Sequence, residues 1–509
     1  MSCDVHIAGV GMSSFKKSTK SLQELMAEAG KKAIQSAHHL PVDSIYIGAM
    51  NVEEFVGDGN FAALLADYMG LSGVASSRVE TACSTGAAVF ESAFYAVASG
   101  YMKNVLVVAG EKMSHLPKTT TARILTEVID REERRYGATM SALAGMIAHR
   151  YQKEFGLSDK RLRKVLARVV EKNSANGTLN PYARAKRTIT KEVYERGRLI
   201  ATPLRLFDCS PNADGAAAVV LTCEKTPIRV SGMGHATDTM ALRHRASITS
   251  FSSTRASALK AYAMAQLNPR DIQFAEVHDA FSIFEIIGTE DLGFFESGQG
   301  WRAVEDGTTA LDGRLPINPS GGLLARGHPA GASGLAQIVE IAMMMLGEVE
   351  GKRQIKWADV GLAQSAGALA NNNVVTILEK SDRHRVLTTG WQPEYKPVIQ
   401  VGTSDGTPGT LDDSGILETY TTLYATPEGF SPPHTLGLVG LEGGRMVLAR
   451  YPKYLEKDRF KIGQRVLLKK RGESMLFETA GFLETMKNRV KSLFGRKTPR
   501  EKRNQNTAP

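Results

Sequence analysis

The stretch Val5-His-Ile-Ala-Gly-Val-Gly11 decides the fold, because its pattern returns at Ile228-Arg-Val-Ser-Gly-Met-Gly234. Each stretch is an apolar run that ends in Gly-x-Gly, as a buried strand does where it enters a tight loop. Two alanines four positions apart follow each run and precede a proline, which is typical of a packed helix face that ends before the proline (Ala33, Ala37 and Pro41; Ala261, Ala265 and Pro269). The repeat therefore predicts two copies of one strand–helix unit.

Each copy also closes on a similar apolar strand, over residues 219–225 in the first and 374–380 in the second. Three matches in the same order predict a duplicated α/β fold, with one half over residues 1–225 and the other over 226–380. The first half is the longer, and we interpret residues 113–205 as its insertion. An insertion on one half of a duplicated fold indicates a lid or a binding lobe.

Positive charge is concentrated in two places. The chain carries 63 Lys and Arg against 53 Asp and Glu, a formal net charge of +10. Residues 113–205 hold 20 Lys and Arg against 9 Asp and Glu, and residues 487–503 hold 8 against one, so the rest of the chain is acidic. This excludes a uniformly basic protein that coats nucleic acid. The basic insertion suits a phosphate-bearing substrate, and the tail over 485–509 is predicted to be solvated and disordered.

The composition is that of an ordinary globular protein, with 509 residues of which 42% are hydrophobic and 23% charged. It excludes collagen-like, coiled-coil and disordered chains. The four cysteines form no Cys-x-x-Cys pair, which argues against a disulfide framework and a zinc ribbon (Cys3, Cys83, Cys209 and Cys223). No apolar run is long enough for a membrane span and no secretory signal stands at the start, so we expect a cytoplasmic protein.

The sequence pattern changes in the C-terminal region. Residues 381–397 are interpreted as a linker with two aromatic anchors, Trp391 and Tyr395. Several short β-rich runs follow within residues 398–484, including a hairpin with a Gly-rich turn, and predict an all-β barrel of the OB type. Such barrels often bind nucleic acid, but few aromatic residues here are placed for base stacking, so we expect no nucleic-acid partner.

Cys83 stands in the run Glu-Thr-Ala-Cys-Ser-Thr-Gly-Ala-Ala over residues 80–88. A short extended stretch precedes it, and small and apolar residues continue to Gly100, which predicts a buried helix beginning at the cysteine. The unpaired N–H groups and the dipole of that helix would lower the pKa of the thiol. The alternative is a buried structural cysteine.

Two histidines lie at the ends of predicted elements further along the chain. His278 follows an apolar strand over 272–277 and precedes a helix that begins near Phe281. His328 stands among glycines over 327–334, which clear space and let backbone approach a ligand. One Cys and two His form a candidate nucleophile–base set, in which an imidazole takes the thiol proton and a second donor stabilises an oxyanion. A Cys/His metal site is the competing interpretation, and no close ligand spacing supports it.

Together these motifs resemble the thiolase superfamily over residues 4–380. The signatures occur in the family's order: ACSTGAA around Cys83, DGAAAVVL at 214–221, HDAF at 278–281 and GGLLARGHPAGASG at 321–334. The HDAF form is similar to the sterol-carrier-type thiolases and to the archaeal and bacterial thiolases that work with an OB-fold partner. The C-terminal region resembles that partner, fused here and without its cysteine-rich zinc ribbon. The resemblance implies a duplicated thiolase fold of two βαβαβαββ halves in five layers (αβαβα), with an inserted loop domain and a C-terminal OB-like barrel.

The resemblance also implies roles for single residues. Cys83 would accept the acyl group, His328 would activate it, and His278 would polarise the thioester oxygen. Backbone N–H groups at Cys83 and near Gly367 would form a second oxyanion hole. The basic insertion would hold the phosphates of coenzyme A, and the Gly-rich turn of His328 would also contact the substrate (Gly327, Gly331 and Ser333).

The implied activity is that of an acyl-CoA C-acyltransferase, which condenses acetyl-CoA with a cysteine-bound acyl group or cleaves a 3-ketoacyl-CoA in reverse. Coenzyme A thioesters would be the substrates, with no metal and no other cofactor. The resemblance further implies a homodimer or homotetramer, and we note a CoA-metabolising enzyme as a candidate partner.

One departure from the family concerns its second cysteine, the acid/base for the α-carbon proton. The two positions where thiolases carry it correspond to Ala280 and to the segment over 364–367, and neither has a thiol. General acid–base catalysis contributes about 10²–10⁴-fold, so a histidine or Cys209 would have to substitute, or the reaction differs. A C–C lyase that cleaves a 3-hydroxyacyl-CoA by a retro-aldol reaction is therefore one alternative. A non-catalytic CoA-binding scaffold subunit is another.

Overall fold

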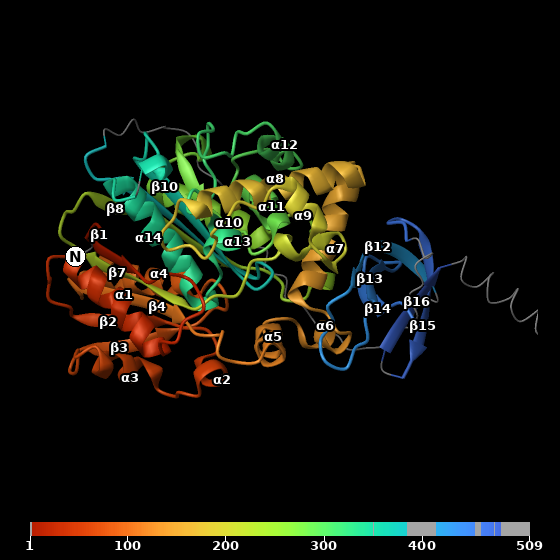
Figure 1. The fold of residues 1–509 in the computed structure, drawn as a ribbon, viewed down its shortest axis with the longest axis horizontal. Coiled ribbons are helices and arrows are strands. Elements are labelled where there is room, and N and C mark those ends of the chain that lie inside the picture. Colours follow the sequence, from red (N-terminus) through yellow and green to blue (C-terminus); the bar gives the residue numbers. More distant parts are fainter. Residues whose placement is uncertain (1–2, 350, 384–413, 453–459, 473, 480–509) are drawn as a thin grey trace, which may run out of the picture.

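The computed structural model describes residues 3–349, 351–383, 414–452, 460–472 and 474–479. Most of the linker predicted over 381–397, with Trp391 and Tyr395, lies outside the described residues. So do the first residues of the domain predicted over 398–484 and the whole tail over 485–509. The described chain consists of a large α/β body with a smaller β-barrel on one side of it (Figure 1).

A nine-stranded mixed sheet organises the α/β body, in the order β3-β2-β4-β7-β1-β8-β11-β10-β9. The first half of the chain supplies β1 (His6–Met12), β2 (Ser44–Gly48), β3 (Ala75–Val79), β4 (Asn104–Glu111) and β7 (Gly215–Thr222). The second half supplies β8 (Ile228–Thr237), β9 (Phe274–Glu276), β10 (Val360–Gly367) and β11 (Asn372–Lys380). The two sets join where β1 and β8 pair antiparallel over two residue pairs.

The strand order confirms the predicted duplication. The set β2-β4-β7-β1 begins with a parallel pair and continues with two antiparallel pairs. The set β9-β10-β11-β8 has the same sequence of pairings. The two halves are therefore copies of one strand arrangement, set side by side.

The glycines of the repeated motif have a different role from the predicted one. Strands β1 and β8 continue through their Gly-x-Gly pairs instead of turning there. A Cβ on Gly11 would collide with the carbonyl of Ala29 in α1 (Leu22–Ser36), and one on Gly234 with the carbonyl of Ser257 in α10 (Ser252–Ala265). The missing side chains let each outer helix pack directly on the backbone of its strand.

Helices lie in three layers around the two half-sheets. Helix α1 packs on β1, β4 and β7, and α10 packs on β8 and β11. Helices α4 (Thr85–Ala98) and α14 (Ser333–Leu346) contact each other, and α14 contacts strands of both half-sheets. Their first turns meet closely, since a Cβ on Gly86 would lie 2.5 Å from Leu335 N. These two helices form the middle layer, which gives the predicted αβαβα arrangement.

The insertion is helical and lies between the half-sheets and the barrel (Figure 1). It contains α5 (Lys118–Thr126), α6 (Arg131–Arg135), α7 (Met140–Glu154), α8 (Asp159–Thr178), α9 (Lys191–Arg196), β5 (Leu199–Ala201) and β6 (Leu204–Arg205). The other helices of the body are α2 (Val52–Val56), α3 (Phe61–Tyr68), α11 (Ser282–Asp291), α12 (Gly300–Glu305) and α13 (Gly322–Arg326), with short 3-10 turns between elements. Within the described ranges, we find no helix whose length and apolar character would let it cross a bilayer.

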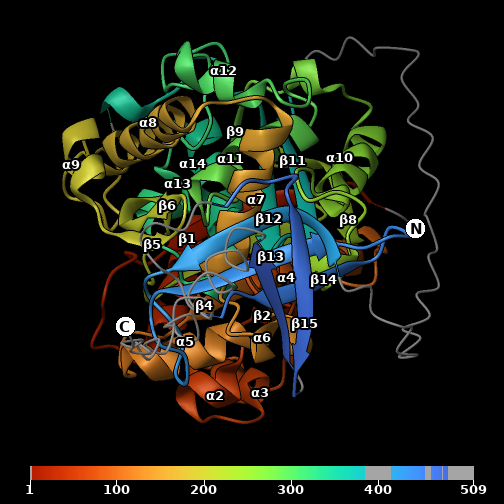
Figure 2. The same ribbon diagram turned by 90° about the vertical axis from the view of Figure 1, so that its right-hand side faces the viewer.

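The C-terminal region forms the predicted OB-like barrel. It contains β12 (Ser414–Leu423), β13 (His434–Gly440), β14 (Met446–Arg450), β15 (Arg465–Arg471) and β16 (Ser474–Thr479). The barrel closes because β12 pairs with both β13 and β15, while β14 pairs in parallel with β16. Its sheet continues into the insertion, since β12 also pairs with β5, and its strands lie across α7 (Figure 2). The barrel therefore shares a sheet with the insertion and packs against it.

Candidate active site

Cys83 lies in a tightly bonded turn before α4. Ser84 Oγ donates to Thr81 O at 2.7 Å, and Thr85 Oγ1 donates to Ala82 O at 2.6 Å. Ala82 has a left-handed backbone with φ +55°, which is uncommon for a residue with a side chain and often marks a functional turn. Helix α4 begins at Thr85, so the cysteine lies just before the first turn of a buried helix, as predicted.

Burial controls the protonation of Cys83. It raises the pKa of the thiol to about 12, and the carboxylates of Glu111 and Glu80 act in the same direction. The backbone N–H groups of Ala368 and of Cys83 itself donate toward the sulfur and lower the pKa, by less than burial raises it. The predicted low pKa is therefore wrong for the free protein, because desolvation outweighs the helix N-terminus. A base must take the proton when the thiol reacts.

Glu111 is a buried group that the sequence analysis missed. Its Oε2 accepts hydrogen bonds from Gly331 N at 3.0 Å and Met50 N at 3.1 Å. Its Oε1 is buried without a partner among the described residues. Met50 belongs to one small apolar cluster with Cys83 and Ala330, so the carboxyl lies directly beside the nucleophile turn. Burial raises the pKa of Glu111 to about 8. Its signal in the sequence is an acidic residue that ends an otherwise apolar strand.

His328 is held through one ring nitrogen. Its Nδ1 lies 2.7 Å from Ser333 Oγ, which in turn lies 2.9 Å from Pro329 O. The hydroxyl has one hydrogen and donates it to the carbonyl, so Nδ1 must carry the proton that Ser333 accepts. Burial, with Arg326 acting in the same direction, lowers the pKa of His328 to about 3. The ring is therefore neutral, with a free lone pair on Nε2.

His278 shows the opposite arrangement. Its backbone N–H donates to Gln364 Oε1 at 2.8 Å, and the N–H of Val277 donates to Asn318 Oδ1 at 2.8 Å. Both ring nitrogens are buried, and neither has a hydrogen-bond partner in the part of the chain that the structure describes. Burial lowers the pKa of His278, with His328 in the same direction. A neutral imidazole with an unused N–H is suited to donate to an oxygen of a bound ligand.

The two rings and the cysteine turn meet at the seam between the duplicated halves. The ring centroids of His278 and His328 are 5.4 Å apart, with the planes at 87°. Ala330, two residues after His328, packs in the same apolar cluster as Cys83. The structure therefore places the two rings against each other and packs the turn of His328 against Cys83.

The predicted backbone group near Gly367 lies on the cysteine side of this place. Strand β10 ends at Gly367, where a Cβ would lie 2.6 Å from Thr81 O and 2.8 Å from Ser84 Oγ. The next residue, Ala368, has φ +50° and directs its N–H toward the sulfur of Cys83. The backbone N–H groups of Ala368 and Cys83 both act to lower the pKa of the thiol.

The other predicted substrate residues lie in the turn of His328. Gly327 has φ +104°, which favours glycine. Gly331 packs so closely that a Cβ there would lie 2.9 Å from Glu111 Oε2. Ser333 orients His328, as described above. In this structure all three residues shape the turn, and their contact with coenzyme A stays a prediction.

Neither position of the family's second cysteine offers a base. Ala280 is buried, and the buried hydroxyl of Ser365 has no hydrogen-bond partner within the described ranges. Cys209, considered above as a substitute, pairs with Phe281 in an isolated bridge, and its Sγ lies 3.7 Å from Arg205 O. Burial raises the pKa of Cys209. A protonated thiol directed at a backbone carbonyl is not poised to remove a proton.

The basic insertion contributes cations to a hollow of about 610 Å³ at its seam with the barrel. Lys153, Arg163 and Arg205 line it from the insertion, and Tyr420 and Lys461 line it from the barrel. No group of three or more His, Cys, Asp or Glu in the described part of the chain is placed to hold a metal ion.

Sequence comparisons match both halves of the body. The family model of the thiolase N-terminal domain matches residues 5–225, and that of the thiolase C-terminal domain-like family matches residues 234–380. An acetyl-CoA acetyltransferase of Methanothermobacter thermautotrophicus is 39% identical over 387 residues, which cover 74% of this chain and 100% of that protein. Sterol carrier protein 2 of Bos taurus is 30% identical over 388 residues, which cover 71% of this chain and 70% of that protein.

Solved structures share the fold. The monomeric SCP2-thiolase like protein type 1 from Mycobacterium smegmatis has a TM-score of 0.71 at 17% identity and covers 94% of this chain and 99% of that chain. An Ltp2-ChsH2(DUF35) aldolase structure has a TM-score of 0.64 at 24% identity, with 75% of this chain and 99% of that chain covered. The two family models and the 39% identity agree, and this chain belongs to the thiolase family of acyltransferase enzymes.

Proposed function

We propose that this protein is an acyl-CoA C-acyltransferase in which Cys83 carries the acyl group. The observation that supports it best is the contrast between two adjoining buried imidazoles: His328 has its N–H bound to Ser333 and offers only the Nε2 lone pair, and of the two rings only His278 has an unused N–H. A thiol that is protonated when free needs the first, and a thioester oxygen that gains charge needs the second. Two relatives named acetyl-CoA acetyltransferase, at 39% and 36% identity, support the same reaction class.

In the first half-reaction, His328 Nε2 takes the proton of Cys83 as the sulfur bonds to the thioester carbonyl carbon. His278 donates to the carbonyl oxygen, which gains negative charge. The bond between that carbon and the sulfur of coenzyme A then breaks, and the leaving thiolate receives the proton from His328. The products are an acyl-Cys83 thioester, free coenzyme A and a neutral His328.

In the second half-reaction, the α-carbon of acetyl-CoA loses a proton and attacks the acyl carbon on Cys83. Because positions 280 and 365 lack thiols, we assign this proton to His328, which is neutral again after the first half-reaction. The N–H groups of Ala368 and Cys83 hold the oxygen of the acyl-enzyme as it gains charge. The Cys83 thiolate leaves and takes the proton from His328. In reverse, the same groups cleave a 3-ketoacyl-CoA.

We assign the phosphates of coenzyme A to the basic insertion, and the approach of its thioester end to the Gly-rich turn of His328. Three cations of the insertion, Lys153, Arg163 and Arg205, line the hollow at the barrel seam. Reversing one charge there, as in Arg163→Glu, should raise KM for a CoA thioester and leave kcat within about twofold. An unchanged KM would place the phosphates elsewhere.

We also propose that two copies of the chain associate through β3, giving a homodimer or a homotetramer. This strand is the edge of the nine-stranded sheet, and none of its residues is buried. An unpaired edge is a template for a second strand. Light scattering of the purified chain tests this, and a monomer at micromolar concentration would contradict it. A CoA-metabolising enzyme as a partner stays a prediction.

The intact mass of the protein after incubation with acetyl-CoA tests the acyl-enzyme. We expect a wild-type adduct of one acetyl group and none in Cys83→Ala. A wild type without an adduct, or an equal adduct in Cys83→Ala, would overturn the proposal.

The second candidate is a C–C lyase on a 3-hydroxyacyl-CoA, which the missing second thiol favours. The aldolase neighbour is 24% identical and supports the fold only. A lyase needs no acyl-cysteine, so its turnover would survive Cys83→Ala, whereas acyl transfer would not. Acyl transfer by the isolated chain would also exclude the scaffold alternative, for which no observation speaks.

A further inference from the structure

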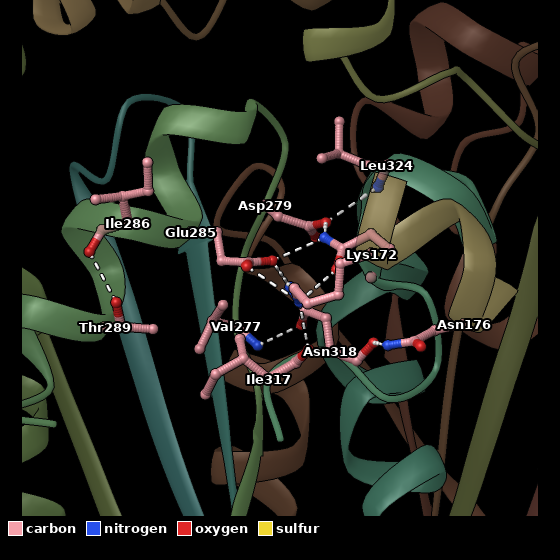
Figure 3. Close-up of polar contacts among 12 residues, drawn as sticks. Lys172, Asn176, Val277, Asp279, Glu285, Ile286, Thr289, Ile317, Asn318 and Leu324 are labelled. Atoms are coloured by element: carbon pink, nitrogen blue, oxygen red, sulfur yellow. Dashed lines mark hydrogen bonds and ion pairs between the residues drawn. The ribbon is translucent and has the colours of Figure 1, made fainter. Parts of the chain in front are cut away.

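A buried polar cluster links insertion helix α8 to the turn of His278 (Figure 3). Its side chains come from four separate segments of the chain (Lys172, Asn173, Asp279, Glu285 and Asn318). Four of them are fully buried, and the side chain of Lys172 is 11% exposed. The cluster lies away from the surface, so its members act on the fold and on the site beside it.

The contacts within the cluster depend on α8. Lys172 Nζ lies 3.1 Å from Glu285 Oε1 and donates to Ile317 O at 2.6 Å. Glu285 Oε2 accepts from Asn173 Nδ2 at 2.7 Å and from Asn318 Nδ2 at 2.9 Å. Asn173 Nδ2 also donates to Asp279 Oδ2 at 2.7 Å. Helix α8 therefore supplies the cation and the amide that the two carboxylates of this cluster share.

The cluster holds the residues on both sides of His278. On one side, Asn318 Oδ1 accepts from Val277 N. On the other, the side chain of Asp279 accepts from the N–H groups of Leu323 and Leu324, at 2.6 and 3.3 Å, where α13 begins. His278 thus has a fixed backbone between two residues of one network, while its ring has no partner among the described residues. Within the described ranges, the hydrogen bonds that position the ring are therefore those of the backbone and of the neighbouring residues, not of the ring itself.

The charges make the network sensitive to Lys172. Burial raises the pKa of Asp279 to about 7, and Glu285 acts in the same direction, so the two carboxyl groups repel each other. Removing one partner of a buried ion pair leaves an uncompensated charge, whereas removing both partners is often tolerated. Loss of Lys172 alone would therefore disturb the groups around Glu285, and Asn318 is one of them.

We propose that Lys172 and Asn173 are positioning residues for His278, which they hold in place through Glu285, Asn318 and Asp279. The insertion then has a second task besides substrate binding: it completes the hydrogen-bond geometry of the oxyanion donor. This inference rests on the role that the proposed function gives to His278.

The test compares Lys172→Met with the double variant Lys172→Met/Glu285→Gln. In the single variant, we expect the single-turnover rate of Cys83 acylation by acetyl-CoA to fall about tenfold or more, with KM within twofold, because removing a whole oxyanion donor costs about 10²–10³-fold. In the double variant both members of the Lys172–Glu285 ion pair are removed together, and Gln still accepts from Asn173 and Asn318, so we expect most of the rate to return. Alkylation of Cys83 by iodoacetamide needs no oxyanion donor and should stay unchanged in both.

Lys32→Met is the matched control. Like Lys172, Lys32 pairs with a glutamate and donates to a carbonyl: it lies 2.9 Å from Glu28 and donates to Met12 O at 3.0 Å. Unlike Lys172, its side chain is 43% exposed and lies outside the insertion. It should acylate like the wild type. Equal acylation of Lys172→Met and wild type would overturn the inference, and so would a double variant as slow as the single one. A wild type that forms no acyl-enzyme would instead overturn the proposed function.

Discussion

At His328 the ring is hydrogen-bonded to Ser333, in a turn rich in glycine. At His278 the main chain is hydrogen-bonded instead: its own N–H donates to Gln364, and the N–H of Val277 donates to Asn318. The His278 ring has no hydrogen-bond partner within the described ranges. Both rings are buried and neutral, so charge does not separate them. Hydrogen bonding does: the N–H of the His328 ring is bound to Ser333 and leaves only a lone pair, whereas the His278 ring keeps an unused N–H together with its own lone pair. The comparison teaches that two equal imidazoles take the roles of base and oxyanion donor from what surrounds them.

The largest effect on the rate of acyl transfer is expected from the loss of His328. His328→Asn removes the base for a thiol whose pKa burial raises to about 12. The rate of acyl transfer should fall about 10²–10⁴-fold, the usual contribution of a general base. Alkylation of Cys83 by iodoacetamide at pH 7 should slow as well. An unchanged alkylation rate would show that His328 does not take the thiol proton.

A smaller effect, confined to acylation, is expected from the loss of His278. His278→Ala should lower the rate of acylation about 10²–10³-fold, because an oxyanion donor is lost. The thiol keeps its base, so alkylation by iodoacetamide should match the wild type. Equal losses in acylation and alkylation would contradict the assignment of His278 as an oxyanion donor rather than a base.

Ser333→Ala probes the hydrogen bond that fixes the proton on Nδ1 of His328. The ring then loses one partner, worth about 1 kcal/mol, and with it the preference for a free Nε2. We expect kcat to fall about fivefold, with KM unchanged. Ser333→Thr, which keeps the hydroxyl, is the control, and a loss in Ser333→Thr equal to that in Ser333→Ala would contradict this explanation.

Glu111→Gln concerns stability more than rate. The folded protein raises the pKa of this carboxyl from an ordinary 4.5 to about 8, so the protonated form is favoured. Its stabilisation is complete below about pH 4.5 and is lost as the pH rises through about 8. The Tm of the variant relative to the wild type should therefore rise between about pH 5 and pH 8, since Gln keeps an acceptor for Met50 and Gly331 and does not ionise. A pH-independent difference would argue against a buried, uncharged Glu111.

The duplicated fold could be predicted because the glycine and alanine pattern is local and occurs twice. Its physical reason was misjudged: Gly11 and Gly234 admit a helix against a strand, a contact between distant residues that the pattern cannot display. The cysteine and both histidines were found because they stand where elements begin or end. Glu111 was missed because its partners, Met50 and Gly331, are far from it in sequence. The pKa of Cys83 was predicted in the wrong direction because helix position is visible in a sequence, whereas depth of burial is not.

The cluster around Lys172 shows the same limit. Apart from Asp279 in the HDAF motif, its members lie outside the motifs quoted above, and Asn173 and Asp279 are 106 positions apart along the chain. Nothing local pairs them. Only the packing of α8 against α11 brings the groups together, and with them the support for His278.

The rate at which acetyl-Cys83 forms is the most direct test of the central claim. Rapid-quench samples of the wild type with acetyl-CoA, analysed by peptide mass, give both the modified residue and its rate constant. We expect an acetyl group on Cys83 that forms at least as fast as the steady-state turnover. An adduct on another residue, or one on Cys83 that forms more slowly than the enzyme turns over, would contradict it.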